Sequence, residues 1–394
     1  MTASRNVGTG SRLAAAGRGH GASAIPVNPP VVRASTFLFQ TLADFEEASR
    51  HPFDGAFYGR VGTPTTFAFE QAMAELEGGF RSIAASSGVA AISAALLAFL
   101  DKGDHVLVVD TVYEPVRRFC NRMLSRLGIE TTFYDPSLGA GIADLIRPNT
   151  RLVYMESPGS GTFEVQDIAA VVAAAKAAGV RTAIDNTWAT PLFFRPLEHG
   201  IDVSIHSGTK YIVGHSDAML GVVTTNAEAY EAVRRATQDL GACAGSEECN
   251  LGLRGLRTLE VRLARHSASA LELAQWLEGQ GQVARVLHPA LPSFPGHAFW
   301  KRDFSGASGL FSIELASRDP EAARHFIDAL EMFRIGFSWG GYESLVLPMH
   351  PEKSRTLPLW NDCGPIVRLQ IGLEDVADLK ADLAQALGRL RPAA

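Results

Sequence analysis

The hydrophobic pattern of the chain changes near residue 65. From there to about residue 206, short apolar runs alternate with segments of helical period, which predicts βαβ units around a mostly parallel sheet. The predicted strands lie at 82–86, 105–110, 130–134, 152–156, 181–185 and 202–206. The predicted helices lie at 67–76, 90–100, 115–127, 142–147, 168–178 and 191–199. The fold class is therefore α/β, with helices between the strands.

The alternation stops at about residue 255, where a long helical pattern begins. The elements expected beyond it are a helix at 257–278, a strand at 309–315, a helix at 320–332, a strand at 366–371 and a helix at 376–390. This mixed order is typical of a smaller α+β domain. The first 60 residues carry Gly, Pro and Asn without a strong period, which indicates an extended arm. We therefore expect an arm over 1–60, a large α/β domain over 61–255 and a C-terminal α+β domain over 256–394.

The composition narrows the class of protein. Hydrophobic residues make up 46% of the 394 residues, as in ordinary globular proteins. A net charge of −6 without a basic stripe argues against nucleic-acid binding. The longest apolar stretch, 84–100, is short for a membrane span and contains three serines, so we expect no membrane protein. The four scattered cysteines predict a reducing, cytoplasmic compartment. The sequence contains no zinc-binding signature, so we expect no metal site.

Candidate chemistry follows four of the predicted strands. The first two of these strands are followed by Ser87-Gly88-Val89 and by Tyr113, the third ends in Asp185, and the fourth is followed by Ser207-Gly208-Thr209-Lys210. Each feature alone has an ordinary explanation, such as a helix cap, a half-buried aromatic ring, a turn carboxylate or a solvated lysine. Because ligands of open α/β sheets bind at the carboxyl ends of the strands, we expect these residues to share one ligand.

The four features together suit pyridoxal 5′-phosphate (PLP). Backbone N–H groups at a helix start, with the hydroxyls of Ser207 and Thr209, bind phosphate. Tyr113 can stack on an aromatic ring, and Asp185 can keep a pyridine nitrogen protonated. Lys210 can form a Schiff base with an aldehyde. A nicotinamide dehydrogenase fits less well, because no Gly-x-Gly-x-x-Gly follows the first strand and no P-loop is present.

Several segments resemble one known family. They are Tyr58-Gly-Arg60-Val-Gly-Thr-Pro64-Thr65, Glu156-Ser-Pro158, Ile184-Asp185-Asn186-Thr187-Trp188 and the segment 207–217. Over nearly its whole length the chain resembles the cysteine/methionine-metabolism family of PLP enzymes. The resemblance implies the fold-type I, aspartate-aminotransferase-like architecture and an amino-acid substrate. It also implies a homotetramer, a dimer of dimers whose active sites are shared between subunits.

The resemblance implies roles for residues that match the family's motifs. Lys210 would hold the cofactor aldehyde and act as the general base, with Tyr113 assisting. Asp185 would pair with the ring nitrogen. The phosphate would be bound by Gly88, Val89, Ser207 and Thr209, and by Tyr58 and Arg60 of a neighbouring subunit. The substrate α-carboxylate would be bound by Arg368, aided by Ser338 and Trp339.

Two features favour the β-lyase branch of this family. Gly159-Ser160-Gly161 follows Pro158 where γ-synthases and γ-lyases have Asn-Pro, and Trp339 stands in Ser-Trp-Gly-Gly-Tyr. The resemblance thus implies β-elimination of L-cystathionine to homocysteine, pyruvate and ammonia, in methionine biosynthesis. γ-Elimination, γ-replacement and cysteine desulfhydration stay open, as does a PLP-binding regulatory module. Gly59, Thr63 and Val89 depart from residues common in the family.

Overall fold

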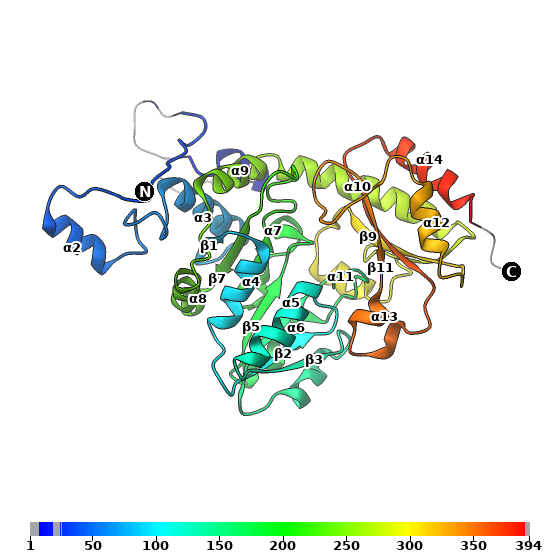
Figure 1. The fold of residues 1–394 in the computed structure, drawn as a ribbon, viewed down its shortest axis with the longest axis horizontal. Helices are drawn as coiled ribbons and strands as arrows, with labels where there is room; N and C mark the ends of the chain where they lie inside the picture. Colours follow the sequence, from blue (N-terminus) through cyan, green and yellow to red (C-terminus); the bar gives the residue numbers. More distant parts are fainter. Residues whose placement is uncertain (1–7, 19–23, 25, 391–394) are drawn as a thin grey trace.

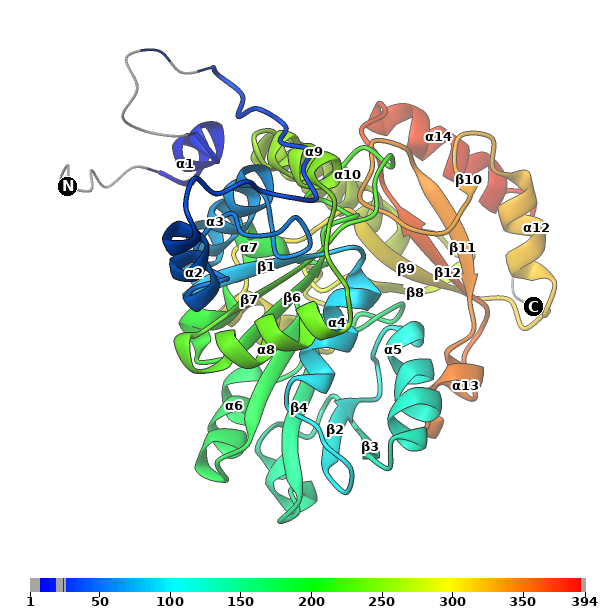
Figure 2. The same ribbon diagram turned by 60° about the vertical axis from the view of Figure 1, so that its left-hand side comes forward.

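The computed structural model describes residues 8–18, 24 and 26–390, and it contains two sheets (Figures 1 and 2). The start of the predicted arm, residues 1–7, and residues 19–23 lie outside the described residues. The first sheet has the order β1-β7-β6-β5-β4-β2-β3. Its strands are β1 (Arg81–Ala85), β2 (His105–Val109), β3 (Glu130–Tyr134), β4 (Thr150–Glu156), β5 (Arg181–Asp185), β6 (Val203–Ser207) and β7 (Gly221–Thr225).

The neighbours β3-β2-β4-β5-β6 are parallel, which confirms the predicted mostly parallel sheet. β7 was not predicted, and it runs antiparallel to both β6 and β1. Helices cover the two faces of the sheet, so the inner strands β2, β4 and β5 are almost wholly buried and rich in apolar residues, whereas the edge strand β3 is more exposed and more polar. These helices are α3 (Pro64–Glu77), α4 (Gly88–Leu97), α5 (Glu114–Phe119), α6 (Ile168–Ala177), α7 (Thr190–Phe193), α8 (Ala227–Asp239) and α9 (Ser246–Leu256).

The arm and several helices differ from the sequence-based expectation, and the helix predicted at 142–147 is a 3₁₀ helix over Gly139–Leu145. The arm contains α1 (Thr9–Ala15) and α2 (Leu42–Arg50), and no residue of α2 is buried. The helix predicted at 115–127 is α5 followed by a π-helical turn over Cys120–Leu124. α8 and α9 were missed. The predicted boundary near residue 255 falls at the end of α9 and stays a prediction.

The second sheet has the order β10-β11-β12-β9-β8, and its strands are antiparallel except for the pair β10–β11. Its strands are β8 (Val283–Leu287), β9 (Leu310–Leu315), β10 (Arg334–Ile335), β11 (Leu345–Met349) and β12 (Ile366–Gln370). The helices of this unit are α10 (Leu259–Glu278), α11 (His297–Asp303), α12 (Ala322–Ala329), α13 (Pro351–Ser354) and α14 (Val376–Leu387). Sequence reasoning predicted β9, β12, α10, α12 and α14, and it missed β8, β10, β11, α11 and α13.

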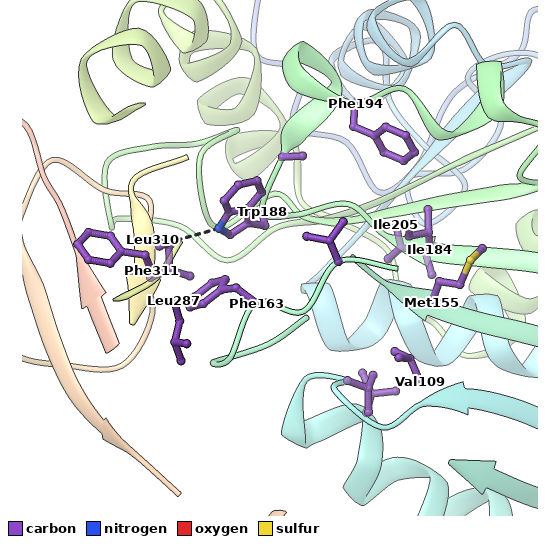
Figure 3. Close-up of a cluster of buried hydrophobic side chains, with 14 of the residues drawn as sticks. Val109, Met155, Phe163, Ile184, Trp188, Phe194, Ile205, Leu287, Leu310 and Phe311 are labelled. Carbon is purple, nitrogen blue, oxygen red and sulfur yellow. Dashed lines mark hydrogen bonds between the residues drawn. The ribbon is translucent and has the colours of Figure 1, made fainter. Parts of the chain in front are cut away.

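One hydrophobic core joins the two sheets (Figure 3). The indole N–H of Trp188, just after β5, donates a hydrogen bond of 2.9 Å to the Leu310 carbonyl in β9. Phe163 and Phe311 are fully buried in the same cluster. The two units are therefore packed directly against each other beside the carboxyl ends of β4 and β5. No helix among the described residues is long and apolar enough to cross a membrane.

Candidate active site

A cavity of about 300 Å³ opens at the carboxyl ends of the parallel strands. Residues of both sheets line it, and ten of the predicted site residues are among them: Gly88, Val89, Tyr113, Asp185, Ser207, Thr209, Lys210, Ser338, Trp339 and Arg368. Three larger hollows, of about 690, 640 and 620 Å³, contain none of the predicted residues. The structure thus brings together residues that are up to 280 positions apart in the chain (368 − 88).

Lys210 lies in the turn that follows β6, where its N–H bonds the Ser207 carbonyl at 3.1 Å. Its Nζ donates a hydrogen bond of 2.6 Å to the Ser338 hydroxyl. Burial, and then the positive charge of Arg368, lower the pKa of Lys210 to about 8. The neutral amine is therefore far more populated near neutral pH than in an ordinary lysine, which favours its action as a general base.

Ser338 connects Lys210 to Arg368. The Ser338 carbonyl accepts a hydrogen bond of 3.0 Å from Nη2 of Arg368, on β12. Ser338 has a φ of 82°, a left-handed conformation that is strained for a serine. The loop then passes close to Lys210, since a Cβ at Gly340 would lie 2.9 Å from the Tyr211 nitrogen. The loop is held tightly between the amine and the guanidinium.

Arg368 is buried without a carboxylate partner among the described residues. Burial lowers the pKa of Arg368 to about 10, and the guanidinium keeps its charge at neutral pH. Trp339 stands beside it in the cavity, 5.5 Å from the Tyr211 ring. A buried guanidinium that faces a cavity is suited to bind a carboxylate with both of its amino groups.

Two buried carboxyl groups end neighbouring strands. Asp185 of β5 and Glu156 of β4 are paired in register. Burial raises the pKa of Asp185, although the N–H of Thr187 donates to it at 2.9 Å. Burial, and then the charge of Asp185, raise the pKa of Glu156 well above its usual range. Asp185 has no ion-pair partner in the described part of the chain, so a protonated ring nitrogen would compensate its charge.

The sequence did not identify Glu156 as a site residue, although the segment Glu156-Ser-Pro158 is one of those that resemble the family. Its carboxylate accepts a hydrogen bond of 2.7 Å from the backbone N–H of Tyr113. Burial, and then the charges of Asp185 and Glu156, raise the pKa of Tyr113. The phenol therefore keeps its proton at neutral pH. The signal that could have identified Glu156 is its place at the end of a buried strand next to that of Asp185.

The N-terminus of α4 forms an anion cradle. Ser87 caps the helix by accepting from the Ala90 N–H at 3.1 Å. The N–H groups of Gly88 and Val89 have no acceptor among the described residues. A Cβ at Gly88 would lie 2.7 Å from the Cβ of Ser207, so only glycine allows this close approach. The Thr209 hydroxyl, in contrast, already exchanges hydrogen bonds with the Leu220 backbone at 2.9 and 3.1 Å.

Tyr58 and Arg60 lie outside this cavity. The Tyr58 side chain is 44% exposed. Arg60 donates hydrogen bonds to the carbonyl and to the side-chain oxygen of Gln238, at 3.0 and 3.2 Å. Within one chain these two residues therefore do not contribute to the pocket.

A family model described as "Cys/Met metabolism PLP-dependent enzyme" matches residues 11–388. The chain belongs to this family. A putative cystathionine beta-lyase of Rhizobium johnstonii is 53% identical over 361 residues, which cover 91% of this chain and 90% of that relative. The cystathionine beta-lyase MetC of Escherichia coli is 44% identical over 387 residues, 96% of this chain and 98% of the relative. The solved cystathionine gamma synthase of Xanthomonas oryzae pv. oryzae, in complex with aminoacrylate and cysteine, has a TM-score of 0.89 at 32% identity, covering 98% and 99%.

Membership confirms the fold-type I architecture and makes PLP the cofactor. The residues present fit this group. The backbone N–H groups of Gly88 and Val89 and the Ser207 hydroxyl suit a phosphate. The unpaired, buried Asp185 suits a protonated pyridine, and the amine of Lys210 suits an aldehyde.

Proposed function

We propose that this chain is a PLP-dependent carbon–sulfur β-lyase that converts L-cystathionine and water to homocysteine, pyruvate and ammonia. One observation carries the proposal: Ser338 holds the Lys210 amine through its hydroxyl and Arg368 through its carbonyl. A base and a carboxylate-binding guanidinium that are hydrogen-bonded to the same residue lie close enough together to act on one α-amino acid. The Rhizobium and Escherichia coli relatives bear the name of this activity.

Each side chain has a definable part in the reaction. Arg368 binds the substrate α-carboxylate and so fixes Cα beside Lys210. When bound, PLP stabilises negative charge at Cα by withdrawing electrons into its ring. Lys210 Nζ removes the Cα proton and delivers a proton to the leaving sulfur, with the Tyr113 hydroxyl assisting. Asp185 keeps the ring nitrogen protonated. The backbone of Gly88 and Val89, with the Ser207 hydroxyl, binds the phosphate, and the Thr209 hydroxyl donates to it once its proton leaves the Leu220 carbonyl.

The wall of the cavity favours β- over γ-elimination. γ-Elimination needs a second proton to be removed from Cβ, whereas β-elimination needs only the Cα proton and an aligned Cβ–S bond. Gly159, Ser160 and Gly161 offer no amide side chain to hold a longer intermediate. The rigid indole of Trp339 lies beside Arg368 and would hold the Cβ–S bond in line.

A product assay tests this proposal. Purified holoenzyme is given L-cystathionine, and the 2-oxo acids are separated by chromatography. Pyruvate with homocysteine is expected, whereas dominant 2-oxobutyrate with cysteine would refute the β-lyase assignment and leave the PLP assignment standing. Trp339→Ala should lower cystathionine turnover more than cofactor content. Trp276→Ala, on α10 outside the cavity, is the matched control.

We propose further that the chain works in the cytoplasm as a homotetramer, a dimer of dimers. Tyr58 and Arg60 would bind the phosphate of the neighbouring subunit's cofactor. Their position outside their own cavity supports this, as does α2, which buries none of its residues within one chain. The four cysteines are free thiols, in keeping with a reducing compartment. Light scattering of the purified protein tests the tetramer.

A further inference from the structure

A segment of the second unit reaches the wall of the active-site cavity. Residues 355–357 follow β11 and α13 and lead back to β12, which carries Arg368. Both ribbon views show α13 beside α5, the helix that begins directly after Tyr113 (Figures 1 and 2). The second unit therefore contacts the strand end that presents the aromatic ring of the site.

The contact is centred on Asp110, the residue that follows β2. Its side chain is only 3% exposed. It accepts hydrogen bonds from the backbone N–H groups of Thr356 and Leu357, at 2.9 and 3.1 Å, and from Arg117 at 2.6 Å. Burial alone would raise the pKa of Asp110, but the bonds from Thr356 and Arg117 lower it. The carboxylate is thus charged and saturated with donors.

Arg355 completes the contact from the other side. Its Nη1 donates to the Asp110 carbonyl at 2.7 Å, and its Nη2 donates to the Ser160 carbonyl and, at 3.0 Å, to the Thr162 hydroxyl. The Ser160 N–H in turn bonds the Thr111 carbonyl at 2.8 Å. The loops 110–113, 158–162 and 355–357 therefore form one hydrogen-bonded assembly, which we call the Asp110–Arg355 network.

We propose that Asp110 and Arg355 are positioning residues for the reaction. They fix Tyr113 and the loop 158–162, which belong to the first unit, relative to Arg368 of the second. The inference rests on the proposed function, because it concerns how the substrate is aligned. The base and the carboxylate site come from different units, so their separation depends on how those units are held together. A misplacement of about 1 Å can reduce the rate about 100-fold.

Matched substitutions test the network in the holoenzyme. In Asp110→Asn and Arg355→Gln, kcat/KM for L-cystathionine should fall about tenfold or more, because Asp110→Asn removes the buried ion pair with Arg117 and Arg355→Gln removes the hydrogen bonds that join the three loops. The cofactor absorbance per chain should stay as in the wild type, because the cofactor groups lie on the first unit. Arg355→Lys should restore part of the activity. Glu314→Gln is the control, since this buried carboxylate also accepts from an arginine, Arg285, and from a backbone N–H, but lies outside the cavity.

Hydrogen exchange gives a second readout that needs no turnover. Peptides spanning 110–113 and 158–162 should exchange about tenfold faster in Asp110→Asn and Arg355→Gln than in the wild type, and Glu314→Gln should leave them unchanged. If Asp110→Asn does not fold, the two Arg355 variants carry the test. Unchanged exchange and kcat/KM in these variants, or equal losses in Glu314→Gln, would overturn the inference. A wild-type enzyme that does not cleave L-cystathionine would overturn the proposed function alone, and the exchange comparison would still decide on the network.

Discussion

The predicted carboxylate site gives the sharpest test of the pocket, through Arg368→Gln and Arg368→Lys. The guanidinium is buried, charged at neutral pH, and hydrogen-bonded only to the Ser338 carbonyl within the described residues. Its fork can offer a substrate carboxylate two charge-assisted hydrogen bonds, each worth about 1.5–3 kcal/mol. The substrate gives up bonds to water, so we take the lower end, about 3 kcal/mol in total. At about 1.4 kcal/mol per factor of ten, Arg368→Gln should lower kcat/KM about 100-fold.

The assay is pyruvate formation from L-cystathionine over a range of substrate concentrations, with cofactor absorbance recorded for each variant. Arg368→Lys keeps the charge but loses the fork, so its loss should be smaller, about tenfold. Arg324→Gln, at an exposed arginine of the same unit, serves as the control. An analogue of cystathionine without the α-carboxylate should be turned over equally slowly by the wild type and Arg368→Gln. A kcat/KM for L-cystathionine within threefold of the wild type in Arg368→Gln would refute the assignment.

Four more outcomes follow from the site. Lys210→Ala should lower turnover about 1,000-fold or more, since both the cofactor anchor and the base are lost, and residual activity close to wild type would contradict its role. Asp185→Asn should keep the cofactor but lower kcat about 10- to 100-fold, because a neutral amide holds the ring proton less well, and steady-state kinetics checks this. Mixing Arg60→Ala with Lys210→Ala protein should restore activity through hybrids with one intact site, and verified hybrids without activity would exclude shared sites. In cofactor-free protein, acylation of Lys210 followed by mass spectrometry should titrate with a pKa of about 8 instead of 10.5, so reactivity is lost as the pH falls through 8.

The strand-end residues were predictable because each one follows a local pattern. Asp185 ends one buried strand and Lys210 follows the next within three residues, and parallel strands bring their carboxyl ends to one edge. β7 escaped prediction because it returns antiparallel after a loop, so no helix separates it from β6 in the expected alternation. β11 escaped because Pro348 interrupts its apolar run, and a proline argues against a strand except at a sheet edge; Pro348 lies at such an edge, since β10 pairs only with Leu345 and Val346.

The contacts between the two units were beyond any local pattern. Ser338 and Lys210 are 128 residues apart, and Arg355 and Asp110 are 245 apart. The sequence assigned Ser338 and Arg368 to the site only through the family resemblance, and it gave no sign of the Asp110–Arg355 network. Such pairs depend on how the second sheet packs on the first, which is decided by a shared core and not by the periodicity of either segment.

The charges of the pocket explain why the base and the carboxylate site must lie close together. Without substrate, the positive charge of Arg368 adds to burial in lowering the pKa of Lys210. A substrate carboxylate bound to Arg368 cancels that charge, so the amine of Lys210 becomes a stronger base when a Cα proton is within reach. Asp185 acts in the opposite sense, since its negative charge raises the pKa of Lys210. That effect weakens once Asp185 is paired with a protonated ring nitrogen. The strength of the base therefore changes with what occupies the cavity, and this coupling requires Lys210, Arg368 and Asp185 to lie close together.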